Sequence, residues 1–255
     1  MPRLRPVEPT PSSAAVGLVT LPIPTAGNGE YLYRCNGEPT AVHETFEVSH
    51  GSPGGRLGHD DGTRRPAVYV QSERTAPGGV QLRVSVELED TRNARCELSY
   101  RDDSGANRRC FYTIVDGSLE VTAEPAPGVA ATSEPVRCGP LPGDGPGPPS
   151  PPASVLSPLL RVFQGPAIAA LIGAGGHGTV IVPALDPDVV DTLLSPTVQT
   201  RNAAELEPGP LRRCSYEGGN YDDAAEFWLD ESDRLVRYLF PQSPTQLWEV
   251  TLTGS

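Results

Sequence analysis

The chain has 255 residues, of which 37% are hydrophobic and 20% are charged, enough apolar material for one large domain or two smaller ones. Its net charge of -12 argues against binding to nucleic acid or to anionic membranes, because both reward basic patches, and it favours an amine-bearing partner. No run of about 18 apolar residues is present, so no transmembrane helix is expected.

The five cysteines, at positions 35, 96, 110, 138 and 214, show neither a Cys-x-x-Cys spacing nor a Cys/His cluster. This pattern predicts no structural zinc site, and no sequence motif points to a cofactor. The N-terminus lacks the long apolar segment of a secretory signal. We therefore expect a cytoplasmic protein with free thiols, with secretion as the less favoured alternative.

Two segments are rich in residues that break regular structure. Residues 1–28 contain six prolines and little periodicity, which predicts a disordered N-terminal tail. In residues 139–152, eleven of the fourteen residues are Pro or Gly, which predicts a loop or linker. It divides the chain into two blocks, 29–138 and 153–255, which we interpret as parts of one β-rich domain.

The first block reads as successive strands. Its clearest strand is residues 80–89, where Val or Leu alternates with polar residues, the pattern of a strand with one buried and one wet face. An Asp-Gly turn at 116–117 predicts a hairpin. The second block opens with an apolar stretch, 154–172, which predicts one or two short buried helices ending in the glycines of 173–178. A further helix is expected at 186–194.

Four more strands are expected toward the C-terminus, near 211–216, 224–229, 235–240 and 247–252. Together these elements predict a mainly β fold: a strongly curved antiparallel sheet or half-open barrel of about ten strands around a short apolar helical insertion. A flat sheet with so many strands would be expected to curl, split or close.

Residues 31–48, the hairpin 110–123 and the segment EFWLDESDRLVRY (226–238) together resemble bacterial half-open β-barrel proteins, the lipoprotein-carrier-like and glycolipid-binding proteins. The resemblance implies a curved sheet that shelters an apolar ligand beneath helices. The Pro-, Ala-, Gly- and Arg-rich composition is similar to that of actinomycete proteins. Some cytoplasmic β-barrel proteins of this sort serve natural-product pathways there, as binding proteins or as ring-forming enzymes.

Three residues are candidates for acid–base chemistry. Glu44 lies on the same face of its strand as Val42 and Phe46, and a carboxylate on an apolar face should have a raised pKa unless it is paired. Asp116 follows a strand on the same face as Tyr112, so these two form a second possible acid–base pair. The alternatives are a covered or rim position for Glu44 and an ordinary turn for Asp116.

A second group suggests ligand binding. Trp228, Tyr238 and Trp248 lie on neighbouring predicted strands, with Glu226 on the same strand face as Trp228. Aromatic rings beside a carboxylate can hold an apolar or cationic ligand, although such rings are more often core residues. Arg201 could reach the cavity as an anion contact. The acidic run 222–233 lacks the spacing of a cation loop, so no metal site is predicted.

These features leave three hypotheses. The first is a soluble protein that binds a small apolar or amphipathic molecule in the concave face of its sheet. The second is a cofactor-independent enzyme of natural-product biosynthesis that catalyses a cyclisation, isomerisation or elimination with a cavity carboxylate. The third is a scaffold that joins a partner subunit through an exposed sheet edge.

Overall fold

The structure, a computed structural model, describes residues 18–51, 68–123, 153–183, 196–218 and 225–254. These residues form fifteen strands, one α-helix and a 3-10 turn in the order β1 (Val19–Thr20), β2 (Gly27–Cys35), β3 (Glu38–His50), β4 (Val68–Thr75), η1 (Pro77–Gly79), β5 (Gln81–Asp90), β6 (Asn93–Arg101), β7 (Asn107–Val115), β8 (Ser118–Ala123), β9 (Ala153–Leu156), α1 (Arg161–Gly173), β10 (His177–Pro183), β11 (Pro196–Glu207), β12 (Arg212–Glu217), β13 (Glu226–Leu229), β14 (Leu235–Ser243) and β15 (Gln246–Thr253).

All fifteen strands belong to one sheet with the order β1-β9-β10-β11-β12-β13-β14-β15-β2-β3-β4-β5-β6-β7-β8. Strand β9 runs parallel to β1 and β10, and the other neighbours are antiparallel. The sheet joins strands from both sides of residues 139–152, and β15 beside β2 links the two ends of the chain.

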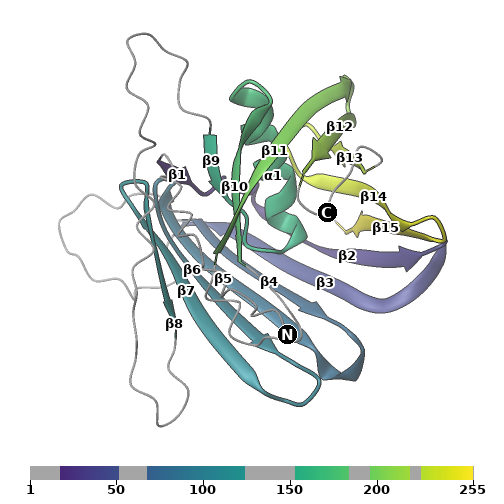
Figure 1. Cartoon of the computed structure of the whole chain (residues 1–255), viewed down its shortest axis with the longest axis horizontal. Helices are drawn as coiled ribbons and strands as arrows, with labels where there is room; N and C mark the ends of the chain where they lie inside the picture. Colours follow the sequence, from purple (N-terminus) through teal and green to yellow (C-terminus); the bar gives the residue numbers. More distant parts are fainter. Residues whose placement is uncertain (1–17, 52–67, 124–152, 184–195, 219–224, 255) are drawn as a thin grey trace, which may run out of the picture.

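The sheet curls until its two ends approach each other (Figure 1). The backbone N–H of Val19, in the first strand of the order, donates to the carbonyl of Gly117, in the turn before the last strand, at 2.8 Å. Leu21 N–H likewise donates to Thr91 O, also at 2.8 Å. The result is a nearly closed barrel, because a sheet of this size that bends consistently brings its edges together.

The predicted fold class is confirmed: the protein is mainly β, with a barrel-like sheet around helix α1. Three details differ from the sequence analysis. The described residues contain fifteen strands rather than about ten. Residues 18–28, assigned to a disordered tail, contain β1 and the start of β2. Residues 154–156, assigned to a helix, form part of β9. The predicted linker 139–152 and helix 186–194 lie outside the described residues.

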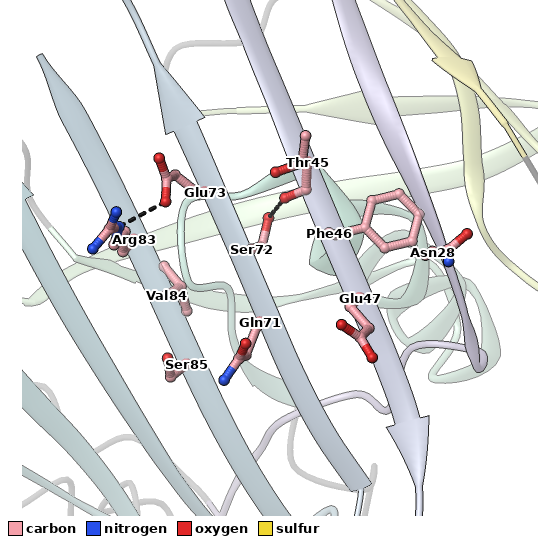
Figure 2. Close-up of a pocket in the computed structure, with 10 residues that line it drawn as sticks. All are labelled: Asn28, Thr45, Phe46, Glu47, Gln71, Ser72, Glu73, Arg83, Val84 and Ser85. Carbon is pink, nitrogen blue, oxygen red and sulfur yellow. Dashed lines mark hydrogen bonds and ion pairs between the residues drawn. The ribbon is translucent and has the colours of Figure 1, made fainter. Parts of the chain in front are cut away.

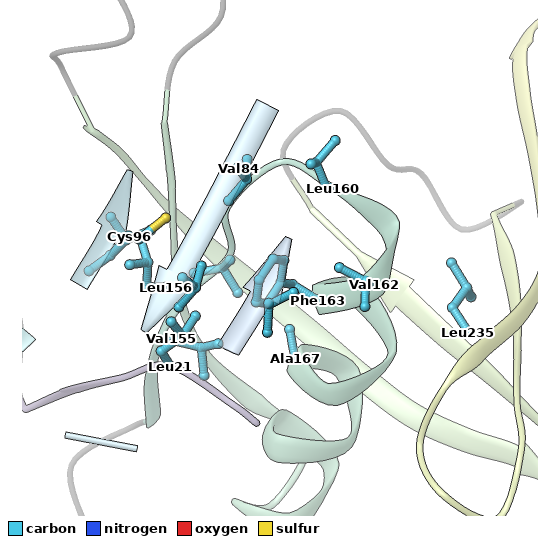
Figure 3. Close-up of a cluster of buried hydrophobic side chains, with 14 of the residues drawn as sticks. Leu21, Val84, Cys96, Val155, Leu156, Leu160, Val162, Phe163, Ala167 and Leu235 are labelled. Carbon is cyan, nitrogen blue, oxygen red and sulfur yellow. The ribbon is translucent and has the colours of Figure 1, made fainter. Parts of the chain in front are cut away.

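Helix α1 fills the concave side of the sheet and forms the core with it (Figures 1 and 3). Eight of its residues are buried, and the ring of Phe163 lies among Val155, Leu156 and Val84 (Figure 3). On the inner side of the sheet, Leu82, Val84, Val86 and Leu88 of β5 are all buried, which confirms the alternation expected for this strand. Since burial of apolar side chains is the main favourable term in folding, the helix and the sheet stabilise each other.

One contact between α1 and the sheet is unusually close. A Cβ atom placed on Gly165 would lie 2.2 Å from the backbone carbonyl of Asp233 and 2.6 Å from the backbone nitrogen of Leu235. Only glycine allows the helix to approach the turn between β13 and β14 so closely. The helix ends at Gly173, in the glycine cluster where its end was predicted.

Candidate functional site

The inner face of the sheet carries a polar cluster centred on Glu44, whose side chain is completely buried. The Tyr33 hydroxyl donates to Glu44 Oε2 at 2.9 Å. The Arg74 guanidinium donates to the same oxygen through Nε at 3.0 Å and through Nη2 at 2.8 Å. Glu44 and Arg74 are direct partners on β3 and β4, so the strand register itself brings the two opposite charges together.

The same cluster holds the start of α1. Glu44 Oε1 accepts a hydrogen bond of 2.5 Å from the backbone N–H of Arg161, the first helical residue. Arg74 Nη2 also donates to the carbonyl of Leu159 at 3.0 Å. A carboxylate at this end is favoured by the helix dipole and satisfies one of the free N–H groups. Glu44, on β3, therefore caps the N-terminus of α1 in place of a local residue, since no side chain of the preceding residues caps this helix.

The backbone before the helix is bent sharply. Leu159 has a φ of 65°, in the left-handed region that a bulky residue rarely adopts. Its carbonyl is the one bound by Arg74. The ion pair thus helps to keep a strained turn in place at the point where the chain enters the barrel.

The phenols on this face titrate abnormally. Burial, followed by the nearby charge of Glu44, raises the pKa of Tyr33 to about 12. The same two causes, in the same order, raise the pKa of Tyr31 further, and burial raises the pKa of Tyr112. Each phenol is held in its neutral form because ionisation would place a charge in an apolar interior.

Stability should therefore fall at alkaline pH. A buried phenol whose pKa lies above the unfolded value of about 10 holds its proton more tightly in the folded state, so its ionisation favours unfolding above that pH. For Tyr33 the loss should extend from about pH 10 to about pH 12. Urea unfolding followed from pH 8 to 12 should show this fall, and Tyr33→Phe should make it shallower. A flat profile would contradict the buried position of these phenols.

A row of aromatic rings continues from this cluster across neighbouring strands. Tyr216, Phe227 and Tyr238 contact one another in turn, with ring centroids 5.6 Å and 4.9 Å apart. An arginine lies over each end of the row: Arg201 is 5.0 Å from the Tyr216 ring and Arg161 is 4.8 Å from the Tyr238 ring. Such cation–π contacts keep both guanidinium groups compatible with burial among rings.

Closer to the ends of the strands, the residues on the inner face are only half-buried. Phe240, Trp248 and Cys35 are direct neighbours across β14, β15 and β2, and Val42 occupies the inner face of β3 two residues before Glu44. All four are half-buried. We call them the rim row. The buried residues Tyr238, Val250 and Tyr33 lie two positions further inward on β14, β15 and β2, the strands of Phe240, Trp248 and Cys35.

The structure separates the residues proposed for acid–base chemistry. Glu44 is on the inner face, as its strand pattern predicted. Tyr112 is fully buried on β7, which is separated from β3 by three strands in the sheet order. Asp116 is exposed in the turn between β7 and β8, with a φ of 50°. The three side chains therefore do not form one site.

The residues proposed for ligand binding are also divided between the two faces. Tyr238, Trp248 and Arg201 face inward. Trp228 is paired directly with Arg237, whose guanidinium lies 4.9 Å from its ring, and therefore points outward. Glu226 shares that outer face and forms an ion pair with Arg213 at 3.3 Å.

Arg74 and Tyr33 were not among the site residues predicted from the sequence. A signal for Arg74 was present, because it follows Val68, Val70 and Ser72 in the inward alternation of β4. A basic residue on an apolar face points to a buried ion pair.

In the described part of the chain, no group of three or more His, Cys, Asp or Glu side chains could hold a metal ion. Nor is any of its helices long and apolar enough to cross a membrane.

Comparison with known proteins adds little to this description. No family model matches the chain, and no curated protein is significantly similar to it. One solved structure, the β-barrel-like protein of domain of unknown function DUF1849 from Brucella abortus, aligns with a TM-score of 0.41 and 6% sequence identity, covering 89% of this chain and 97% of that chain. A similarity this distant defines no family, and the fold described above rests on the strand pairing of this chain alone.

Proposed function

We propose that the protein binds a small amphipathic molecule at the rim row, with the apolar part of the ligand against Phe240 and Trp248. The observation that carries this proposal is the half-buried aromatic and aliphatic edge itself. The partly exposed Arg74 guanidinium lies 5.6 Å from the ring of Tyr33, which is two residues inward from Cys35 of the rim row. Binding sites for small molecules combine such apolar surfaces with a few placed polar groups. Tryptophan suits this position because its ring is apolar, while its N–H is already satisfied by Gln242 at 2.7 Å.

Arg74 supplies the polar end of the proposed site. Its side chain remains 22% exposed, and within the described residues only its Nε and Nη2 atoms donate hydrogen bonds. The third nitrogen, Nη1, can donate to a carboxylate, phosphate or hydroxyl group of a ligand. An amine at this point would face a like charge, so an amine-bearing ligand would have to direct its nitrogen elsewhere.

Calorimetric titration with three ligands of equal chain length tests the proposal. Dodecanoate should bind most tightly, dodecanol less tightly and dodecylamine weakest, because only the first offers an anionic acceptor to Arg74. Trp248→Ala should weaken dodecanoate binding about tenfold or more, as expected for a buried aromatic contact. The matched variant Trp228→Ala, on the outer face, should leave the affinity unchanged. Equal effects of the two variants, or no binding of any of the three ligands, would overturn the proposal.

The second candidate is a cofactor-independent enzyme of natural-product biosynthesis that moves a proton through Glu44. The buried hydrogen bond between Tyr33 and Glu44, 2.9 Å long, is the observation that favours it. Both Glu44 oxygens already accept hydrogen bonds, however, so a substrate would have to displace a donor to reach the carboxylate. We therefore rank binding above catalysis.

We also propose that the protein is cytoplasmic. Among the cysteines of the described residues, Cys35, Cys96 and Cys214 are free thiols. Unpaired thiols are usual in a reducing compartment, whereas secreted proteins tend to oxidise theirs.

A further inference from the structure

A hollow separate from the rim row lies on the outer face of the sheet. It has a volume of about 530 Å³ and is formed by strands β2 to β5. Figure 2 shows it from the side opposite α1. A volume of this size is within the range of sites for small molecules. The side chains around the hollow that point toward solvent are all polar. The two apolar residues of the lining, Phe46 and Val84, are buried on the inner side of the sheet.

One row of polar side chains crosses the hollow. The strand register places Asn28 opposite Glu47, Glu47 opposite Gln71, and Gln71 opposite Ser85. All four are exposed, and within the described residues no hydrogen bond or ion pair involves their side chains. They offer amide, carboxylate and hydroxyl groups side by side, which together can both donate and accept hydrogen bonds.

In the next row, the side chains of Glu73 and Arg83 bind each other. Arg83 Nε donates to Glu73 Oε2 at 2.6 Å, and the second oxygen of Glu73 accepts from the Gln81 amide. Figure 2 shows the ion pair at the edge of the hollow. Comparable cross-strand ion pairs occur elsewhere on the outer face, such as Arg237 with Glu249 at 2.7 Å. Unlike these ion-paired side chains, the side chains of the first row are available for hydrogen bonds to a ligand.

The charges of the hollow limit what could bind there. Glu73 and Arg83 neutralise each other, which leaves Glu47 as the unbalanced charge of the lining. An anion would be repelled by this carboxylate and by the net charge of -12 of the whole chain. An apolar molecule would find no exposed ring on the floor of the hollow.

We propose that this outer hollow binds an uncharged, hydroxyl-rich molecule such as a saccharide. Each hydroxyl group of such a ligand can donate one hydrogen bond and accept another. It can therefore satisfy the amides of Asn28 and Gln71 and the carboxylate of Glu47 without bringing a charge. Because the exposed row is already hydrated, ligand and water compete, and dissociation constants in the millimolar range, corresponding to roughly -4 kcal/mol, are expected.

NMR titration of the ¹⁵N-labelled protein tests this site. Maltose, cellobiose and N-acetylglucosamine serve as probes, and sodium sulfate as the anionic comparison. At least one saccharide should shift the amide resonances of residues 28, 45–47, 71–73 and 83–85 in a saturable manner, whereas sulfate should not. Gln71→Ala and Glu47→Ala should each weaken that binding at least fivefold. Glu120→Ala, an exposed position on β8, is the control and should leave it unchanged.

The inference would be overturned by the lack of a saturable shift with any saccharide, by saturable shifts with sulfate as well, or by saccharide binding that survives both Gln71→Ala and Glu47→Ala. All of the substitutions are at exposed positions and should leave the fold intact, which the spectra themselves report. Shifts at the rim row alone would also contradict it. Since the ligands and residues differ from those of the rim row, failure at one site leaves the other proposal unaffected.

Discussion

Replacement of Glu44 by Gln should reduce the free energy of unfolding by about 3–5 kcal/mol, the loss typical of breaking a buried ion pair from one side. The substitution leaves the Arg74 guanidinium without its buried counter-charge. It also replaces the carboxylate oxygen that caps Arg161 at the start of α1. Urea unfolding monitored by circular dichroism measures the change, because its midpoint shifts with stability when the slope is constant.

Two further variants separate the charge effect from other causes. Glu47→Gln makes the same chemical change on the same strand but on the exposed face, and should alter stability by less than about 0.5 kcal/mol. The double variant Glu44→Leu with Arg74→Leu removes both charges, and should recover much of the loss, as has been found for buried pairs replaced by apolar residues. If Glu44→Gln were as harmless as Glu47→Gln, the capping role of Glu44 would be wrong.

Replacement of Gly165 by Ala should destabilise the protein by about 3 kcal/mol, the upper part of the usual range for overpacking. The added Cβ would lie 2.2 Å from a backbone carbonyl and 2.6 Å from a backbone nitrogen of the turn that precedes β14. Neither atom belongs to a side chain that could rotate away. Helix α1 would have to move as a whole, and its buried contacts with the sheet would loosen.

Gly173→Ala provides the matched control in the same helix. A Cβ at this position would meet no atom within 4 Å, and alanine is favoured over glycine in helices by up to about 1 kcal/mol. Thermal unfolding should therefore show an unchanged or slightly higher midpoint for Gly173→Ala and a strongly lowered one for Gly165→Ala. Similar midpoints for both variants would contradict the close packing of α1 on the sheet.

Much of the fold could be predicted from local patterns. The alternation in residues 80–89 indicated β5 and its inner face, and the Asp-Gly turn marked the hairpin of β7 and β8. Strands β1 and β9 were missed because they contain only two and four residues. Their parallel pairing joins positions such as Val19 and Ser154, which are far apart in the chain. No local pattern encodes such a contact. In addition, an apolar run as short as 154–156 shows no period, so it fits a buried strand or a helix equally well.

The candidate site was less accessible to sequence analysis. The strand pattern placed Glu44 on the inner face, but Arg161, whose backbone N–H donates to the Glu44 carboxylate, lies 117 positions further along the chain. Trp228 and Tyr238 were expected together, yet the hairpin register pairs Tyr238 with Phe227 and Trp228 with Arg237. Because side chains alternate along a strand, a shift of one residue in register moves a ring to the opposite face. The turn at 230–234 determines that register, and its geometry was not evident from composition.

Fluorescence of two single-tryptophan variants tests the proposed ligand site most directly. Trp228→Phe leaves Trp248 in the rim row as the reporter, and Trp248→Phe leaves Trp228 on the outer face. Titration with dodecanoate should produce a saturable change in emission for the first variant, with a dissociation constant matching the calorimetric value. It should produce none for the second. A response from Trp228 alone, or from neither residue while calorimetry shows binding, would place the ligand away from the rim row and contradict the account.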